Sequence, residues 1–125
     1  MNSSANLQRH ELNPAQHCII LADKHSKYVL PLQTILRLES KRVYTIVYFK
    51  NRKELVCCKN IKVVYESLNS PDFFRVHRSH VINLREIKSI ECGKIVMSDD
   101  TKVDVSQRKK TAFMKVFYEL IESRD

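Results

Sequence analysis

The sequence predicts a mainly β domain with a minor α-helical part and a helix at its C-terminus. Short apolar stretches alternate with polar residues along most of the chain, and polar turns separate them, which is typical of short antiparallel strands. Apolar residues at helical spacing appear in only two segments, residues 61–68 and 112–121. The chain has a single glycine, so its turns rely on Asn, Asp and Ser, which favours compact β structure with short loops.

Length and composition indicate one folded domain preceded by an arm. A chain of 125 residues builds one modest core, and a hydrophobic content of 43% excludes a disordered polymer. Residues 1–16 are polar, contain Pro14 and lack periodicity. We therefore expect a flexible arm or linker over residues 1–16 and the domain over residues 17–125.

The strands follow from the alternating apolar segments. We expect them at residues 18–21, 28–30, 35–39, 43–49, 54–58, 73–77, 88–92, 95–98 and 102–105. We expect turns at residues 23–27, 40–42 and 51–52, around Gly93, and at residues 99–100. Cys57 and Cys58 are adjacent on one strand and point to opposite faces, so they neither pair readily nor chelate one ion together.

Two helices follow from apolar residues spaced at three and four. Asn60 is placed to cap the first, over residues 61–68, and Pro71 closes that segment. Ser106 is placed to cap the last helix. The apolar stripe of that helix consists of Ala112, Phe113, Val116, Phe117, Leu120 and Ile121.

The net charge of +8 and the pI near 9.5 indicate a polyanionic partner, such as nucleic acid or an acidic membrane surface. The excess is clustered. Residues 41–62 hold seven lysines and arginines against one acid, and residues 75–110 hold nine against five. This clustering favours a binding stripe over a general contribution to solubility.

Several classes of protein are excluded by what the sequence lacks. No window has 18 consecutive apolar residues, so a membrane span is not expected. Residues 1–17 have no apolar core of the kind a signal peptide needs, which predicts a cytoplasmic protein. Its four cysteines are then expected to be reduced packing residues rather than disulfides.

The segment FFRVHRSHVINL, residues 73–84, carries the strongest functional signal. Arg75, His77, Arg78 and His80 are cationic or potentially cationic and lie within six positions, with Ser79 among them. Such a cluster repels itself unless an anion lies opposite. Arginine, histidine and serine are also donors that reach phosphate oxygens and base edges. The alternative is a solvated basic face without a ligand.

A second basic cluster opens the last helix. Arg108, Lys109 and Lys110 are expected in its first turn, where each cation opposes the helix dipole by about 0.3–1 kcal/mol. Glu119 and Glu122 lie near the opposite, negative end. A bound anion at the helix start would compensate for this reversed polarity. The alternative is that the long lysines are simply exposed and tolerated.

Taken together, these segments resemble the LytTR family of bacterial DNA-binding domains. The resemblance covers residues 18–121. It is carried by ILRLESKRVYTIVYF at residues 35–49, by FFRVHRSHVINL, and by the run from Gly93 to the VSQRKK stretch at residues 105–110. It implies an elongated fold of short antiparallel sheets with one or two short helices and a C-terminal helix. It also implies that inter-strand loops read successive major grooves of duplex DNA.

Carried across by position, the resemblance implies three DNA-reading loops. Their residues are Lys41, Arg42 and Tyr44; Arg75, His77, Arg78 and Ser79; and Ser106, Arg108, Lys109 and Lys110. The first loop departs from the family, because Lys41-Arg42-Val43 replaces the common Asp-Gly-Asn type of turn.

We expect different roles within this set. Arg78 and Arg108 would read bases, because a guanidinium is bidentate toward guanine O6 and N7. The expected phosphate contacts are Arg42, Arg75, Lys109 and Lys110. His77 or Ser106 would orient or reach the backbone, and Tyr44 is open to a stacking role, a phosphate role or a packing role.

The resemblance also bears on partners. It implies direct-repeat DNA sites, and we expect a monomer in free solution that has a second copy beside it on DNA. Family members usually carry a receiver or membrane-sensor domain, and none fits in this sequence. The expectation is a free-standing regulator controlled by a partner protein, or the DNA-binding part of a longer protein.

Other functions remain open at this stage. The rival is a non-catalytic β-sheet interaction module whose basic face binds an acidic protein or RNA. It would spread the cations across a strand face, whereas DNA reading needs them on loop tips along one edge. His77, His80 and Cys92 lack metal-ligand spacing, and His80 is expected to be a packing residue. No nucleophile-elbow or glycine-rich phosphate loop is present, so we expect neither an enzyme nor a cofactor.

Overall fold

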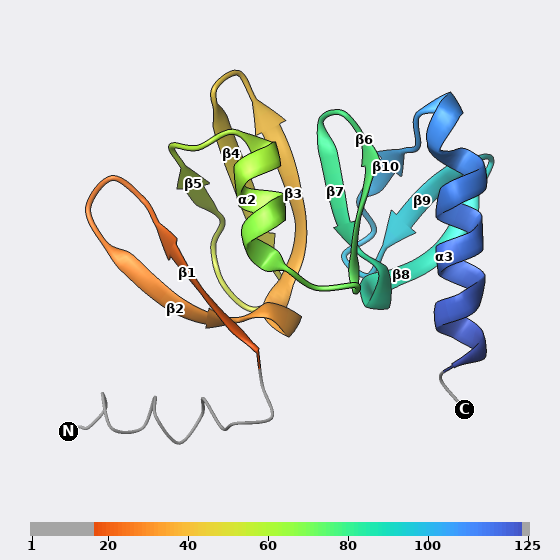
Figure 1. Cartoon of the computed structure of the whole chain (residues 1–125), viewed down its shortest axis with the longest axis horizontal. Helices are drawn as coiled ribbons and strands as arrows, with labels where there is room; N and C mark the ends of the chain where they lie inside the picture. The colour runs from red at the N-terminus through yellow and green to blue at the C-terminus, as the bar shows by residue number, and fades with distance from the viewer. Residues whose placement is uncertain (1–16, 124–125) are drawn as a thin grey trace.

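The computed structural model describes residues 17–123, and it has the mainly β architecture that the sequence predicts. Three antiparallel sheets lie side by side along the long axis of the molecule, with two helices packed on them (Figure 1). The expected arm at residues 1–16 lies outside the described residues. Neither helix of the described part of the chain has the length and apolarity that a membrane crossing requires.

The first sheet is a hairpin of β1 (Cys18–Ala22) and β2 (Lys27–Pro31). Asp23 closes its turn, since its Oδ1 accepts hydrogen bonds from the backbone N–H of His25 and of Ser26, each at 2.8 Å. These two bonds are the main reason why the pKa of Asp23 is lowered. A short 3₁₀ turn, Leu32–Thr34, leads into the next sheet.

The central sheet has five strands in the order β5-β4-β3-β7-β6. Their bounds are β3 Ile35–Lys41, β4 Tyr44–Phe49, β5 Leu55–Cys57, β6 Phe73–His77 and β7 His80–Asn83. Strand β7 is not predicted from the sequence, because three of its four side chains are buried and its residues show no alternation. Cys57 is buried and Cys58 is exposed, as their adjacency predicts.

The third sheet has the order β10-β9-β8 and follows a 3₁₀ turn at Leu84–Glu86. Its strands are β8 Ile87–Glu91, β9 Lys94–Met97 and β10 Lys102–Asp104. Gly93 and Asp100 have positive φ values, +78° and +70°, in the two connecting turns, at the positions where the sequence predicts turns.

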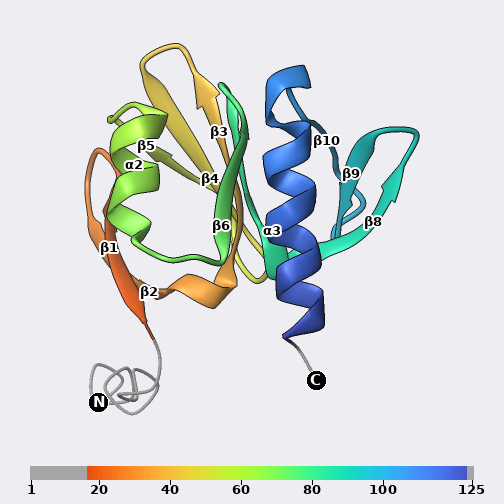
Figure 2. The ribbon, with the colours of Figure 1, turned by 45° about the vertical axis from the view of Figure 1, so that its right-hand side comes forward.

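The helix α2 (Ile61–Leu68) lies against the central sheet (Figure 2). The Asn60 side chain caps it by accepting a hydrogen bond from the Val63 N–H at 3.0 Å. The helix ends before Pro71, where Asn69 adopts a left-handed conformation with φ +46°.

The C-terminal helix α3 (Lys110–Glu122) begins later than the sequence predicts. Gln107–Lys109 form a 3₁₀ turn ahead of it, and the Ser106 side chain makes no capping hydrogen bond. The prediction that Ser106 caps this helix is therefore wrong, and of the three cations only Lys110 lies within α3. The predicted apolar stripe is also narrower in the structure, because Phe113 is buried whereas Ala112 and Ile121 are exposed.

The apolar residues form two cores, one on each side of the central sheet. One lies under α2 and joins the first hairpin to strands such as β3 and β4. The other lies between the central sheet, the third sheet and α3, with Phe113 at 2% exposure. A rigid support on both sides fixes the turns at the ends of the central strands.

Candidate nucleic-acid interface

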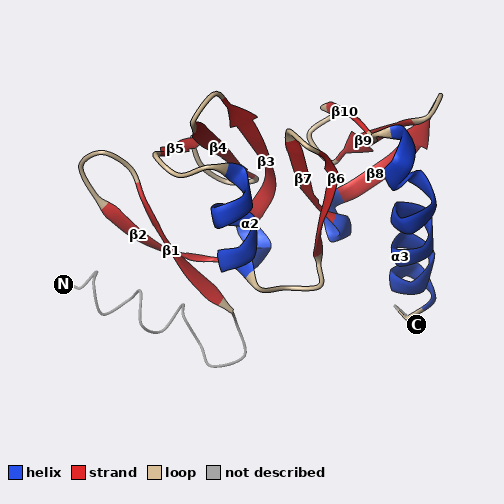
Figure 3. Cartoon of the chain, turned by 45° about the horizontal axis from the view of Figure 1, so that its top comes forward, coloured by secondary structure: helices blue, strands red, loops and turns tan. Residues whose placement is uncertain are grey.

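Three basic segments lie along one edge of the molecule. The β3–β4 turn, the β6–β7 turn and the start of the α3 region all stand at the top of Figure 1, and Figure 3 brings that edge toward the viewer. They come from separate parts of the sequence, and the antiparallel pairing of β3 with β7 places the first two next to each other. The Ser40 N–H donates to the Ser79 carbonyl at 2.9 Å across this junction.

The first turn is tighter than the sequence predicts. Lys41 pairs with Tyr44 in the β3–β4 register, so only Arg42 and Val43 form the connection instead of residues 40–42. All four of these residues are exposed. Arg42 has φ +58°, a left-handed conformation that costs a residue with a Cβ about 1–2 kcal/mol.

The second turn is held by its own side chains. Arg75 Nη2 donates to the Arg78 carbonyl at 2.6 Å, and the Ser79 N–H donates to His77 Nδ1 at 3.0 Å. Because His77 Nδ1 accepts a hydrogen bond, Nε2 is left as its donor. The Arg78 side chain carries no such bond and is exposed. The Arg78 side chain is therefore exposed at this turn, whereas the Arg75 side chain stabilises the turn.

The third segment is attached to the second. The Ser106 N–H donates to the Val76 carbonyl of β6 at 2.8 Å, and the Lys109 N–H donates to the Ser106 carbonyl at 2.9 Å. Lys109 Nζ lies 5.9 Å from the centroid of the Phe74 ring, at the outer range of a cation–π contact.

The second and third segments enclose a cleft of about 330 Å³. Its lining residues are Arg75, His77, Arg78, Ser106, Arg108 and Lys109. None of them is acidic, so the cleft is strongly electropositive. The structure thus brings Arg78 and Arg108 together at one cleft. The β3–β4 turn lies beside this cleft. Lys110 is exposed at the start of helix α3 and does not line the cleft.

The cations of this edge have no carboxylate partners. Within residues 17–123 the ion pairs involve Arg37, Lys50, Arg85, Lys88 and Lys94 instead. The acids nearest the second turn are already engaged: Asp104 lies 2.9 Å from Lys94, and Glu39 accepts a hydrogen bond from the Tyr48 hydroxyl. The basic edge is consequently free to receive an anion.

His80 lies beneath the second turn. Its ring centroid is 5.2 Å from that of His77, and its Nδ1 is buried without a hydrogen-bond partner. Burial lowers the pKa of His80, and electrostatic interactions with His77 and Arg37 add to this effect, whereas Glu39 and Asp104 oppose it. His80 is therefore a half-buried packing residue that favours the neutral form.

Sequence reasoning did not single out two residues of this edge. The Phe74 ring lies 5.9 Å from Lys109 Nζ. The sequence signal that could have identified Phe74 was its place in an aromatic pair ahead of the basic run. Val43 is exposed at the tip of the first turn, at 69%. The only signal for Val43 was that an apolar residue replaces a polar turn residue.

The family model described as the LytTr DNA-binding domain matches residues 25–118 of the chain. This match spans most of the molecule. The chain belongs to the LytTR family of DNA-binding domains. The resemblance drawn from the three sequence motifs is thereby confirmed.

A solved structure has the same fold. It is described as the LytTr DNA-binding domain of a protein assigned as a methyl-accepting/DNA response regulator from Bacillus cereus. It matches with a TM-score of 0.67 and 22% sequence identity, over 82% of this chain and 97% of that chain. No curated protein sequence matches the chain.

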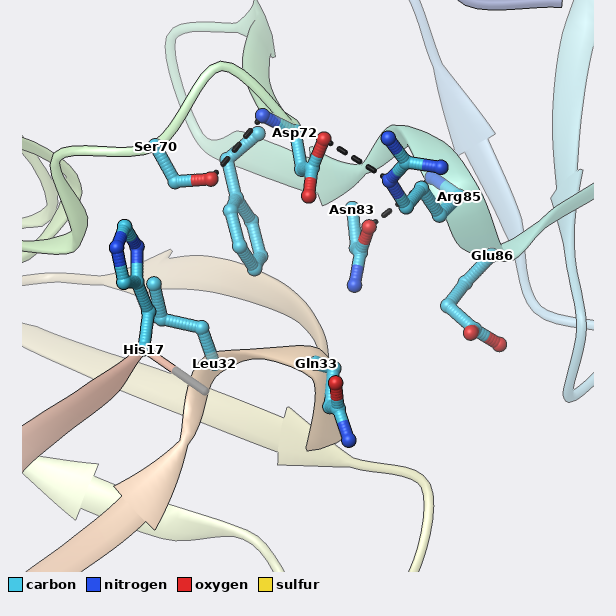
Figure 4. Close-up of a pocket in the computed structure, with 9 residues that line it drawn as sticks. His17, Leu32, Gln33, Ser70, Asp72, Asn83, Arg85 and Glu86 are labelled. Carbon is cyan, nitrogen blue, oxygen red and sulfur yellow. Dashed lines mark hydrogen bonds and ion pairs between the residues drawn. The ribbon is translucent and has the colours of Figure 1, made fainter. Parts of the chain in front are cut away.

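This LytTR domain has another cleft, of about 270 Å³, shown in close-up in Figure 4. It lies beside the 3₁₀ turns Leu32–Thr34 and Leu84–Glu86, at the edge opposite the basic turns (Figure 1). Asp72 and Arg85 lie on the same side of this cleft, with Asp72 Oδ1 3.0 Å from Arg85 Nε, and Asn83 Oδ1 accepts a hydrogen bond from the Arg85 N–H at 3.0 Å. The Glu86 carboxylate pairs with Lys50 at 3.0 Å. Because these charges are satisfied locally, this cleft does not share the unpaired positive charge of the opposite edge.

Proposed function

We propose that this LytTR domain is a sequence-specific transcription regulator that reads the major groove of duplex DNA through its three basic turns. The observation that carries the proposal is the cleft formed by Arg75, His77, Arg78, Ser106, Arg108 and Lys109, which has no acidic lining. Membership of a DNA-binding family supports the class of ligand.

The charge distribution supports a polyanion as the ligand. The cations on the three turns are unpaired, whereas five other cations have carboxylate partners. Cations crowded together destabilise the free protein, and phosphates relieve that repulsion while releasing their counterions. Phosphate binding would therefore offset the electrostatic repulsion that destabilises the free domain.

The geometry supports different roles for the two arginines of the second turn. Arg75 spends one donor on the Arg78 carbonyl, so we assign it to holding the turn and to a phosphate contact with its remaining donors. Arg78 and Arg108 are exposed and unpaired, which leaves each guanidinium free for bidentate contact with a guanine.

The remaining residues are assigned to the DNA backbone. Lys109 and Lys110 would contact phosphates at one end of the interface, and Lys41 and Arg42 would do so at the other. Tyr44 is 43% exposed beside the first turn, which suits a phosphate or stacking contact. The half-buried hydroxyls of Ser79 and Ser106, and His77 Nε2, would donate to the sugar–phosphate backbone.

The position of the cations favours DNA over the rival ligands, an acidic protein or RNA. The exposed cations lie on turns and element ends along one edge, whereas a flat acidic surface would be matched by cations across a strand face. Turns of this size protrude and can enter the major groove of B-DNA, which the deep, narrow groove of A-form RNA does not allow.

The proposal is tested by selecting bound sequences from random duplexes and measuring their affinity by fluorescence anisotropy. We expect an enriched motif that binds at least tenfold more tightly than a scrambled duplex and than an RNA duplex of the same sequence. Equal affinity for the selected and scrambled duplexes would reduce the domain to a nonspecific basic module. Preference for RNA would establish the rival function.

We further propose that the domain acts on direct repeats, with one copy on each repeat, and is monomeric when free. The Bacillus cereus domain of the same fold is assigned to a response regulator, so we propose that a receiver or sensor function controls this domain as well. That control would come from the same polypeptide or from a partner protein.

A further inference from the structure

Val43 is the most exposed large hydrophobic residue among residues 17–123, at 69%. It occupies the second position of the two-residue turn between β3 and β4, after Arg42. Two-residue hairpin turns favour Asn-Gly, Asp-Gly or Gly-containing pairs, and here the residue at positive φ is Arg42 rather than a glycine or an asparagine. Folding stability therefore does not explain an Arg-Val pair here.

The location of Val43 is more informative than its exposure, because single exposed apolar residues are common on protein surfaces. The preceding residue, Arg42, is held at φ +58°. Backbone strain of this kind is concentrated at ligand-binding sites. The turn also lies on the basic edge, tied to the second turn by the hydrogen bond from Ser40 to Ser79.

We propose that Val43 contacts the C5 methyl group of a thymine in the major groove, and so makes the domain require thymine at one position of its site. This inference rests on the proposed function. The thymine methyl is the apolar group among the base edges of that groove, and apolar side chains recognise it. Lys41 and Arg42 beside Val43 are exposed, so they can hold phosphates while the valine reaches the base.

Valine also suits this contact energetically. Its side chain has one rotatable bond with few accessible rotamers, so fixing it against a methyl group costs little entropy. Water leaves both apolar groups at the same time. A methyl-sized contact is worth about 0.8 kcal/mol, which corresponds to about a fourfold change in affinity.

The experiment replaces each thymine of the selected duplex, one at a time, by deoxyuridine, which lacks only the C5 methyl group. Affinities are measured for the wild-type chain, for Val43→Ala and for the matched control Val29→Ala. Val29 is 51% exposed on β2 in the first hairpin, away from the basic edge. Thermal unfolding of both variants is expected to match the wild type, because both side chains are largely exposed.

We expect one thymine whose replacement weakens wild-type and Val29→Ala binding about fourfold, the value of a methyl-sized contact. Val43→Ala should bind the thymine duplex about fourfold more weakly and be insensitive to that replacement. Three results would each overturn the inference while leaving DNA binding intact. The wild type could bind equally well after every thymine replacement, or the selected motif could contain no thymine. Val43→Ala could also lose as much affinity as the wild type when that thymine is replaced. Loss of discrimination between selected and scrambled duplexes in the wild type would instead overturn the proposed function together with this inference.

Discussion

Arg75 and Arg78 show how one turn uses the same residue type in two ways. Arg75 is half-buried on β6, its Nε is buried without a partner, and its Nη2 bonds to the Arg78 carbonyl. Arg78 has an exposed side chain at the tip of the turn. Arg75 therefore shapes the loop, whereas the side chain of Arg78 is exposed to solvent.

Replacing Arg78 or Arg108 by alanine should each cost about 1–3 kcal/mol of specific DNA binding. Both side chains are exposed and unpaired, so the free energy of unfolding should hardly change. Relief from the helix dipole should be small for Arg108→Ala, because Arg108 precedes α3 and the dipole effect is confined to the terminal turn. Competition titrations and urea unfolding measure the two quantities. Arg85→Ala, on the opposite edge, is the control that should bind normally, and unfolding of either test variant would make its arginine structural.

His80 should make stability depend on pH. Burial lowers its pKa in the folded state below the ordinary value of 6.5, so below that value the unfolded chain binds more protons than the folded one. The free energy of unfolding should therefore be flat above about pH 6.5 and fall as the pH drops toward the folded-state pKa. Urea unfolding at a series of pH values measures this dependence.

His80→Gln should reduce the fall in the free energy of unfolding below about pH 6.5. His25→Gln should retain this fall, because His25 lies exposed in the β1–β2 turn. Two identical slopes for His80→Gln and the wild type would show that His80 does not cause the dependence.

At the scale of elements, the two helices begin differently. The side chain of Asn60 makes a capping bond, and the Ser106 side chain makes none. The 3₁₀ turn at Gln107–Lys109 is instead fixed through backbone bonds of Ser106 to Val76 and Lys109. A polar residue in front of an apolar periodic segment therefore predicts a helix better than it predicts the capping bond.

This difference predicts unequal effects of two conservative truncations. Asn60→Ala should destabilise the domain by about 1 kcal/mol, because the Val63 N–H loses its acceptor. Ser106→Ala should leave the free energy of unfolding within about 0.5 kcal/mol of the wild type, as expected for a substitution that removes no such bond. Equilibrium unfolding in urea compares them, and a larger loss for Ser106→Ala would contradict the structure at this position.

At the scale of the whole molecule, two cores on opposite sides of the central sheet make a rigid row of sheets. The basic turns lie on one edge of that row, and the paired charges of the second cleft lie on the other. If the proposed function holds, the basic edge of this 14.7 kDa chain would cover little more than one turn of a DNA duplex. Tight occupancy should then require two copies on adjacent repeats.

Duplex binding should be strongly salt-dependent. If roughly five of the cations on the basic turns meet phosphates, log affinity should fall with log salt at a slope of about −4 to −5. Titrations of duplexes with one or two selected half-sites, at several salt concentrations, measure the slope and the effect of the second site. A slope near zero would show that these cations do not contact phosphates. Equal occupancy of single and double sites would argue against pairing on repeats.

The sequence by itself determined the local features of this protein. Alternation placed most of the strands, helical spacing and Asn60 placed α2, and adjacency put Cys57 and Cys58 on opposite faces. These features depend on neighbouring residues, whose geometry is fixed by the backbone period. The family resemblance then indicated which basic residues to group together, although no local pattern joins Arg78 to Arg108.

Only the tertiary structure decided how those local pieces meet. The short strand β7 is recognised by its partners β3 and β6, because its side chains are buried on both sides and show no alternation. The bond from Ser106 to Val76 brings the third basic segment to the second and so creates the cleft. The register within the β3–β4 and β6–β7 hairpins also fixed the two-residue turn that exposes Val43 and placed Arg75 next to the Arg78 carbonyl. The pairing of β7 with β3 and the bond from Ser106 to Val76 join residues far apart in the chain, so their geometry is set by packing and hydrogen bonding across the fold rather than by local sequence.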